Sequence, residues 1–198
     1  MPNEDSDRRF CRAVLWENVE RPGTDYCALW ETREGWLLQG TAAVAHDDQH
    51  PVLASYEIFC DFEWRTHRVR VQCSTGGDAA RLSLLVEGGG TWRDEGRILP
   101  AVEGCVDVDL ALTPATNTLP IRRLNLDLNQ SAEVTAAWIR FPGLDLQSLP
   151  QRYTRLGNRL YKYESASGFV TEIEVDDLGL VVNYKGGWER IAVHSNTS

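Results

Sequence analysis

The feature that most constrains the fold of this chain is an alternation of apolar and polar residues with a period of two. In Glu103–Leu112 the apolar side chains from Val106 onward occupy even positions, whereas Asp107 and Asp109 occupy odd positions. A β-strand with one buried face has this period, because successive side chains point to opposite faces of a sheet. The same alternation predicts strands over His67–Cys73, Arg81–Glu87, Ile121–Leu128 and Phe169–Val175.

Turn-forming residues separate these runs and are typical of a meander of hairpins, as at Pro22-Gly23, Gly76-Gly77, Gly157-Asn158 and Gly186-Gly187. Arg9–Asn18 and Val52–Phe62 fit a helical stripe almost as well as a strand. We assign both as strands because β-branched and aromatic residues are frequent in or beside them. A sheet of so many strands must twist and curl. We therefore predict an all-β fold, in which a large antiparallel sheet of hairpins is curled into a roll or incomplete barrel.

The chain has 198 residues, a length that suits one domain, and no linker or low-complexity run divides it. We predict a single domain over residues 10–194, preceded by a flexible polar tail over residues 1–9. The tail lacks the apolar segment of a signal peptide. The five cysteines are odd in number and form no C-x-x-C pair. Both observations favour a cytoplasmic protein with reduced thiols.

The charge of the chain disfavours two classes of partner. Twenty Lys and Arg against 29 Asp and Glu give a net charge of −9. Nucleic acids and anionic membrane surfaces both attract basic proteins, so neither is an expected partner. No apolar run approaches the ~20 residues of a transmembrane helix, so we expect no stable insertion into a membrane. The sequence leaves the oligomeric state open.

The usual motifs of nucleotide-binding proteins, zinc proteases and serine hydrolases are absent from the sequence. We therefore expect no cofactor, no metal ion and no catalytic residue that a motif could identify. His46, Asp47, Asp48 and His50 lie together before Pro51, and we interpret this stretch as a solvated loop rather than a metal site.

Asp107 and Asp109 have two possible roles. On one face of a strand they would lie about 6.5–7 Å apart, near the separation of the paired carboxylates of sugar hydrolases. The alternative role is an ion pair with Arg122 or Arg123, within ~4 Å. Pro114 and Pro120 exclude an uninterrupted helix in the segment between the acidic and basic residues.

Trp92 is the tryptophan with the most suggestive position. It follows Gly88-Gly89-Gly90 and Thr91 and precedes polar residues. An aromatic ring in such a place suits the face of a sugar or an amphipathic ligand. The alternative is that Trp92 caps the end of the roll.

One long segment carries a family resemblance. Cys105–Leu110, followed by Thr113–Leu124 with the sequence TPATNTLPIRRL, resembles the signature of a bacterial glycolipid-binding family, formerly a domain of unknown function. Supporting pieces in the family's order include Trp64-Arg65-Thr66, Gln151-Arg152-Tyr153 and Asp176–Tyr184. The resemblance implies a large curled antiparallel sheet, and the family's name rests on the likeness of that fold to lipid carriers. It supplies no catalytic residue.

We therefore expect a non-catalytic protein that binds a glycolipid or another amphipathic small molecule. The acyl chain would lie on the apolar concave face, which the same side chains could equally fill. The candidates for binding the polar end of the ligand are Trp92, Asp107, Asp109, Asn117, Arg122 and Arg123. Two alternatives stay open. One is a hydrolase or isomerase acting on a glycoside or lipid, marked by a deep pocket with a carboxylate of raised pKa. The other is an interaction protein with an exposed, uncharged sheet edge.

Overall fold

The computed structural model describes residues 8–46 and 50–196, which form one 15-stranded sheet. Two 3-10 turns, η2 (Pro100–Val102) and η3 (Ala115–Asn117), and one helix, α1 (Thr118–Leu124), interrupt the strands. The strands are β1 (Arg9–Asn18), β2 (Gly23–Thr32), β3 (Gly35–Ala45), β4 (Pro51–Cys60), β5 (Thr66–Ser74), β6 (Ala79–Glu87), β7 (Thr91–Asp94), β8 (Arg97–Ile98), β9 (Asp107–Leu110), β10 (Ser131–Arg140), β11 (Asp145–Arg155), β12 (Leu160–Ser165), β13 (Val170–Val175), β14 (Val181–Tyr184) and β15 (Trp188–Ser195).

The strands follow the order β8–β7–β6–β5–β4–β3–β2–β1–β15–β14–β13–β12–β11–β10–β9 across the sheet. The C-terminal strand β15 thus joins two meanders by pairing antiparallel with β1. Every pairing is antiparallel except that of β9 with β10, which is parallel. The prediction of an all-β fold with a large antiparallel sheet curled into a roll or incomplete barrel is confirmed, since the sheet is mostly antiparallel and does not close, and β8 and β9 are its two ends.

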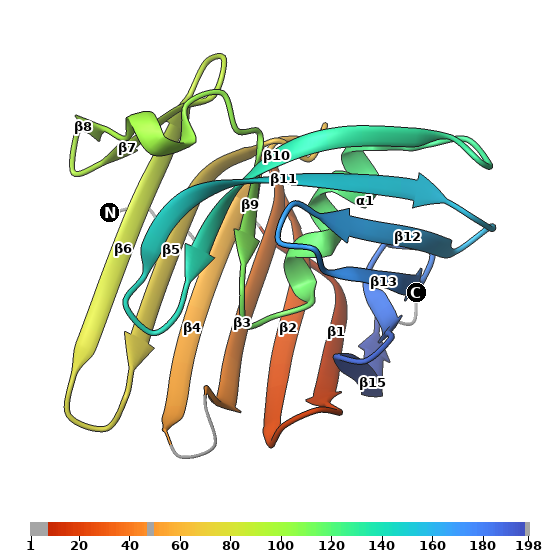
Figure 1. The fold of residues 1–198 in the computed structure, drawn as a ribbon, viewed down its shortest axis with the longest axis horizontal. Coiled ribbons are helices and arrows are strands. Elements are labelled where there is room, and N and C mark those ends of the chain that lie inside the picture. Colours follow the sequence, from red (N-terminus) through yellow and green to blue (C-terminus); the bar gives the residue numbers. More distant parts are fainter. Residues whose placement is uncertain (1–7, 47–49, 197–198) are drawn as a thin grey trace.

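The sheet folds over on itself. In Figure 1 the strands β10–β13 cross in front of β1–β6, and β9 and α1 lie between these two layers. A main-chain hydrogen bond joins β5 of the first layer to the residue before β9. In this bond the Thr66 N–H donates to the Val106 carbonyl at 3.3 Å. The fold therefore places the end of the sheet, β9, in the middle of the roll.

The predicted strands at Arg9–Asn18 and Val52–Phe62 are confirmed as β1 and β4. Of the predicted tail, residues 1–7 lie outside the described residues, and Arg9 is the first residue of β1. Within Glu103–Leu112 only Asp107–Leu110 pairs as a strand.

The predicted strand at Ile121–Leu128 is wrong, because its first half belongs to the helix α1. Pro120 lies in the first turn of α1, where a backbone N–H has no partner within the helix, so proline is tolerated there. Leu119 and Ile121 are buried on the inner side of the helix. Asn125 has a φ of 42° and ends α1 in a left-handed conformation. Tertiary packing of these apolar residues therefore selects a helix over the two-residue period.

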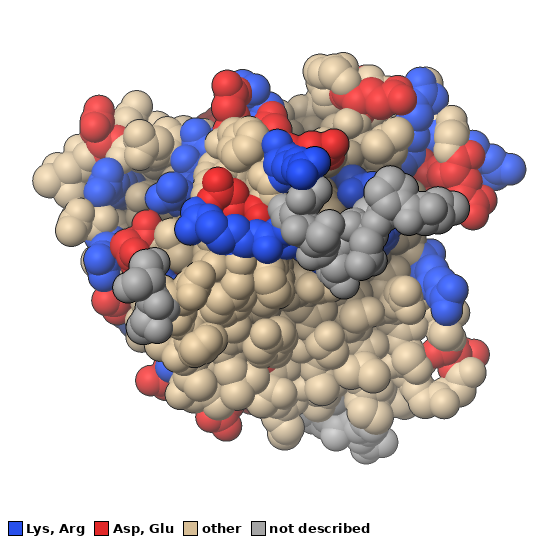
Figure 2. All heavy atoms as spheres, turned by 180° about the vertical axis from the view of Figure 1, so that it is seen from behind, with Lys and Arg blue, Asp and Glu red and all other residues tan. Residues whose placement is uncertain are grey.

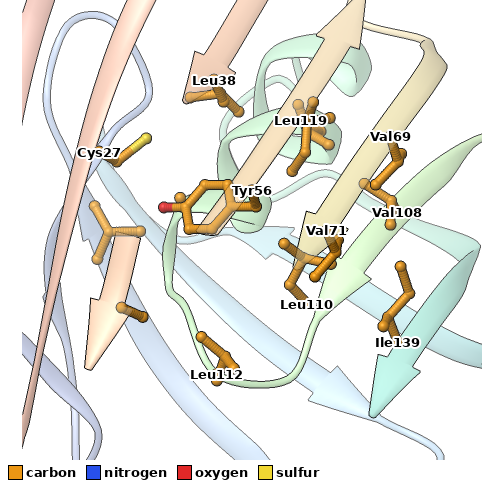
Figure 3. Close-up of a cluster of buried hydrophobic side chains, with 14 of the residues drawn as sticks. Cys27, Leu38, Tyr56, Val69, Val71, Val108, Leu110, Leu112, Leu119 and Ile139 are labelled. Atoms are coloured by element: carbon orange, nitrogen blue, oxygen red, sulfur yellow. The ribbon is translucent and has the colours of Figure 1, made fainter. Parts of the chain in front are cut away.

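The apolar interior of the roll is filled by side chains. Figure 3 shows Val69 and Val71 of β5 facing Val108 and Leu110 of β9, with Ile139 of β10 beside them. Trp16 and Trp92 are completely buried in the same cluster. The acyl-sized space expected on the apolar concave face is thus occupied by the protein's own core.

The opposite, outward face of the first layer differs in character. Figure 2 shows a wide area without charged side chains below a band of Lys, Arg, Asp and Glu. The strand register explains this area, because uncharged residues meet across six neighbouring strands. They are Ala192, Leu15, Tyr26, Thr41, Ser55 and Gln72 of β15 and β1–β5 in spatial order.

Candidate functional site

A cleft of about 400 Å³ opens between the C-terminal strands and the segment that follows β9. This volume lies in the range of roughly 300–1,000 Å³ that is usual for small-molecule sites. We call it the aromatic cleft, because six aromatic side chains line it together with Asp109, Asn117 and Ser165. The aromatic residues are Trp138, Phe141, Tyr163, Phe169, Tyr184 and Trp188.

Strand register brings these residues to one concave surface. Asp109 of β9 lies opposite Trp138 of β10, and Gln151 of β11 lies opposite Ser165 of β12. Paired residues in a sheet point to the same face. The alternation of β11 and β12 therefore puts Gln151, Tyr153 and Tyr163 on the surface to which Asp109 belongs.

Asp109 is held by neutral partners only, among the contacts of the described residues. Its Oδ2 atom accepts a hydrogen bond from Gln151 Nε2 at 2.5 Å, and the Thr116 hydroxyl gives it further support. Burial raises the pKa of Asp109 to about 6, because these two hydrogen bonds offset only part of the cost of burying a charge. The carboxyl group is thus poised to gain or lose a proton near neutral pH.

The aromatic rings form a continuous cluster beside this carboxylate. The Tyr163 ring centroid lies 5.2 Å from that of Tyr153 and 6.3 Å from that of Tyr184. Phe169 stacks on Tyr184, with centroids 5.9 Å apart and planes inclined by 7°. Burial raises the pKa of Tyr163 and Tyr184, and the nearby charge of Asp109 adds to the effect. These tyrosines therefore remain neutral phenols.

Asn117 lines the cleft from the turn η3. Its Oδ1 atom accepts a hydrogen bond from the Tyr153 hydroxyl at 2.9 Å, and its Nδ2 donates to the Pro114 carbonyl at 3.1 Å. These bonds fix the amide at the wall of the cleft. Asn117 and Asp109 are the two predicted site residues that the structure brings to the aromatic cleft.

Asp107 and Arg123 form the predicted ion pair. Arg123 Nε donates to Asp107 Oδ1 at 3.0 Å and Nη2 donates to Oδ2 at 2.6 Å. The Asp107 side chain is 1% exposed, so this two-point contact is buried. The expected contact within 4 Å is confirmed for this pair, which anchors α1 to β9 and leaves Asp107 without a free oxygen for a ligand.

Arg122 and Trp92 do not line the aromatic cleft. The Arg122 guanidinium lies 5.5 Å from the Trp64 ring centroid and donates to the Asp177 carbonyl at 3.4 Å. Trp92 is 0% exposed, and its Nε1 donates to the Cys105 carbonyl at 2.8 Å. The prediction of Trp92 as a ligand platform is therefore corrected, because η2 and the segment after it cover the ring and give its N–H a partner.

Several cleft residues were missed in the sequence analysis. Among them are Tyr163 of β12, Tyr184 of β14 and Trp188 of β15. Their common signal is a large polar-aromatic residue on the inner side of a strand whose other inner residues are apolar. Such a pattern does not say which strands meet, so the grouping needed the tertiary structure.

A second buried polar group adjoins the cleft through Thr113. The Thr113 hydroxyl donates to the Asp25 carboxylate, which also accepts from the Tyr56 hydroxyl at 3.1 Å. Burial raises the pKa of Asp25 to about 7, against the effect of these hydrogen bonds. The group ties the segment after β9 to strands β2 and β4 of the first layer.

Two further features of the described chain bear on ligands. Residues 8–46 and 50–196 contain no group of three or more His, Cys, Asp or Glu side chains that could hold a metal ion. Asp47 and Asp48 of the predicted solvated loop lie outside these residues. Within the same ranges no helix has the length and apolar character needed to cross a membrane.

Comparison with known proteins gives four findings. The family model described as "Putative glycolipid-binding" matches residues 13–190. A DUF1089 family protein of known crystal structure from Pseudomonas aeruginosa is 33% identical, covering 84% of this chain and 92% of that chain with a TM-score of 0.77. A β-barrel-like protein of the DUF1849 family from Brucella abortus is 8% identical, covers 96% and 99% of the two chains with a TM-score of 0.57, and shares the fold alone. No functionally curated protein matches the chain.

Proposed function

The chain belongs to the glycolipid-binding family, and from this premise we propose that it binds the sugar-bearing head group of a lipid in the aromatic cleft without altering it chemically. One observation carries the proposal. The cleft joins six aromatic side chains to a carboxyl group, an amide and a serine hydroxyl. Aromatic faces suit the apolar face of a sugar, and fixed polar groups suit its hydroxyls.

The filled core decides which part of the ligand the protein would hold. The apolar interior contains fully buried side chains such as Trp16, Tyr56 and Ile58, so it offers an acyl chain no place there. The cleft would therefore take the head group and the first methylenes. Because each buried methylene contributes only about 0.8 kcal/mol, we expect modest affinity that depends on the head group.

The catalytic alternative is less well supported. Asp109 meets the criterion of a cleft carboxyl group with a raised pKa. Sugar hydrolysis usually needs a second carboxyl group, and both oxygens of Asp107 are bound by Arg123. The lone Asp109 supports binding better than hydrolysis.

The interaction-protein alternative finds no suitable sheet edge in the described chain. One end of the sheet, β8, has two residues and includes Arg97. The other end, β9, is inside the roll, with Val108 and Leu110 each 1% exposed. Short or covered edges resist pairing with another chain.

We extend the proposal to the compartment. All five cysteines are free thiols and four of them are buried. Free thiols persist in a reducing environment, which supports the expected cytoplasmic location in a bacterium. Fractionation of the native cells, followed by immunoblotting, tests this part of the proposal.

The proposed function is tested by titrating the protein with octyl β-glucoside below its micelle concentration while following tryptophan fluorescence. We expect saturable binding, which Phe169→Ala weakens because this exposed ring stacks at the cleft. Phe62→Ala is the matched control, since Phe62 is 56% exposed, Phe169 is 43% exposed, and Phe62 does not line the cleft. Absence of saturable binding, or equal loss in both variants, would overturn the proposal. Release of glucose from the glucoside would favour the hydrolase instead.

A further inference from the structure

The Asp109 carboxylate in the aromatic cleft has no cationic partner among the contacts of the described residues. Asp109 contacts the neutral Gln151 and Thr116, while the nearby cation Arg123 is bound through two atoms to Asp107. A buried carboxylate normally requires a cationic partner or several hydrogen bonds. The Asp109 carboxylate can therefore pair with a cationic ligand, since no cationic side chain of the described chain pairs with it.

The surroundings of Asp109 suit a cation rather than a metal ion. The faces of aromatic rings attract ammonium groups, and Tyr163, Tyr184 and Phe169 form a cluster of rings with centroids 5.9–6.3 Å apart. The negative charge of Asp109 reaches this cluster, since it contributes to raising the pKa of Tyr163 and Tyr184. A metal ion would need several oxygen or nitrogen ligands, and the described residues that line the cleft form no group of three or more His, Cys, Asp or Glu side chains that could hold one.

The charged groups around the cleft define how such a ligand would enter. Glu20, Arg21 and His46 line the cleft near the β1–β2 turn and the end of β3. The Arg21 guanidinium donates to the His46 carbonyl at 2.9 Å, so it is fixed by the protein backbone. Asp107 and Arg123 form the ion pair behind Asp109. The titratable side chains that face Asp109 from β11, β12 and β14 are Tyr153, Tyr163 and Tyr184.

We propose that the head group bound in the aromatic cleft carries an ammonium group, which pairs with the Asp109 carboxylate against the rings of Tyr163 and Tyr184. This inference rests on the proposed function and narrows it, because it selects amino sugars over neutral sugars. An ammonium group without a sugar, such as a quaternary amine, shares the same chemistry. The ammonium group of the ligand neutralises the Asp109 carboxylate, which no cationic side chain of the described chain contacts.

The test compares four ligands with the same octyl chain, each below its micelle concentration. They are the β-glucoside, the 2-amino-2-deoxyglucoside, its N-acetyl derivative, and octyltrimethylammonium. At pH 7, where both the amine of the sugar and the Asp109 carboxylate are mostly charged, we expect the amino sugar to bind about tenfold or more tightly than the N-acetyl derivative, because a charge-assisted hydrogen bond and a cation–π contact are added. Asp109→Asn should remove this preference, so that the amino sugar and its N-acetyl derivative bind the variant with equal affinity.

A measurement on the wild-type protein keeps the inference testable if Asp109→Asn does not fold. Octyltrimethylammonium keeps its charge at every pH, so its binding reports the ionisation of Asp109. We expect its affinity to fall several-fold between pH 8 and pH 5, as the carboxylate is protonated, while the glucoside shows no such fall. A matched variant, Glu20→Gln, tests whether the rim carboxylate causes the effect instead.

The outcomes separate the two proposals. Equal binding of the amino sugar and its N-acetyl derivative would overturn the ammonium inference and leave the proposed function standing. Binding of octyltrimethylammonium without any glucoside would support the ammonium site and count against a sugar ligand. If none of the four ligands binds, both proposals fail. If Glu20→Gln, and not Asp109→Asn, removes the preference, the assigned residue is wrong.

Discussion

The guanidinium of Arg123 holds the carboxylate of Asp107 by two hydrogen bonds, of 3.0 and 2.6 Å, in the space between the two layers of the sheet. The pair joins α1 to β9 and so fixes the position of β9, which carries Asp109 into the wall of the aromatic cleft. Planar guanidinium groups match carboxylates in this two-point geometry. The relationship explains why one of two adjacent acidic residues is structural and the other faces the cleft.

Removal of Arg123 should destabilise the protein strongly. Arg123→Ala leaves the buried Asp107 carboxylate without its partner, and breaking a buried pair in this way costs about 3–5 kcal/mol. Arg122→Ala is the matched control, because Arg122 is exposed and should cost less than about 1 kcal/mol. Urea unfolding at pH 7 measures both changes. Similar losses in the two variants would contradict a special role for the Asp107–Arg123 pair.

Asp25 should make the stability depend on pH. Its pKa in the folded protein is raised to about 7, so the folded state keeps the proton in a range where the unfolded state has lost it. The free energy of unfolding therefore falls as the pH rises from about 4 to about 7, and each unit of pKa is worth about 1.4 kcal/mol. Asp25→Asn should remove this pH dependence. The free energy of unfolding of the variant, relative to that of the wild type, should therefore increase from pH 5 to pH 8.

Urea titrations of Asp25→Asn at pH 5 and pH 8 check this expectation. Glu174→Gln, at an exposed position of β13, serves as the control for a change from carboxylate to amide. A stability difference between Asp25→Asn and the wild type that is the same at both pH values would show that Asp25 does not titrate as expected.

Gly40 should not tolerate a side chain. A Cβ atom at this position of β3 would lie 2.3 Å from the ring of Tyr56, its cross-strand partner, and 2.5 Å from the Tyr26 carbonyl oxygen. Gly40→Ala would displace the ring whose hydroxyl donates to Asp25, and overpacking of this kind costs about 1–3 kcal/mol. Gly77→Ala is the control, since its Cβ would meet nothing within 4 Å. Thermal unfolding distinguishes them, and an unchanged Tm for Gly40→Ala would refute the steric argument.

Substitution of Trp92 should lower the stability without changing ligand affinity, whereas substitution of Trp188 should weaken ligand binding. Trp92→Phe leaves the Cys105 carbonyl without its donor, which costs about 1–3 kcal/mol of stability, and it should not change ligand affinity because Trp92 lies outside the cleft. Trp188→Phe alters a ring that lines the cleft and should weaken binding of octyl glucoside. Chemical unfolding and fluorescence titration of both variants decide the matter. Weaker binding in Trp92→Phe at unchanged stability would restore Trp92 as a ligand contact.

Several strands could be predicted from the amino-acid sequence, because a period of two is satisfied only when one face of a sheet is buried. The positions of β5, β6 and β13 followed from alternation, those of β1 and β4 from β-branched and aromatic residues, and the curled sheet from the number of strands. An ion pair between Asp107 or Asp109 and Arg122 or Arg123 could also be predicted, since opposite charges in two nearby segments attract, but the sequence did not say which residues would form it.

The helix α1, the contact of Asp109 with Gln151 and the burial of Trp92 depend on tertiary packing and could not be predicted from alternation. Residues 121–124 begin the segment Ile121–Leu128 that was predicted as a strand, but they form a helix in which Leu119 and Ile121 are buried. Asp109 meets Gln151, which is 42 positions further along the chain, through the parallel pairing of β9 with β10 and the next strand, β11. Trp92 was placed in the core by η2 and the segment after it. A local pattern fixes which face of a strand is apolar, but the cleft depends on which distant strands become neighbours, and only the packing of the whole chain settles that.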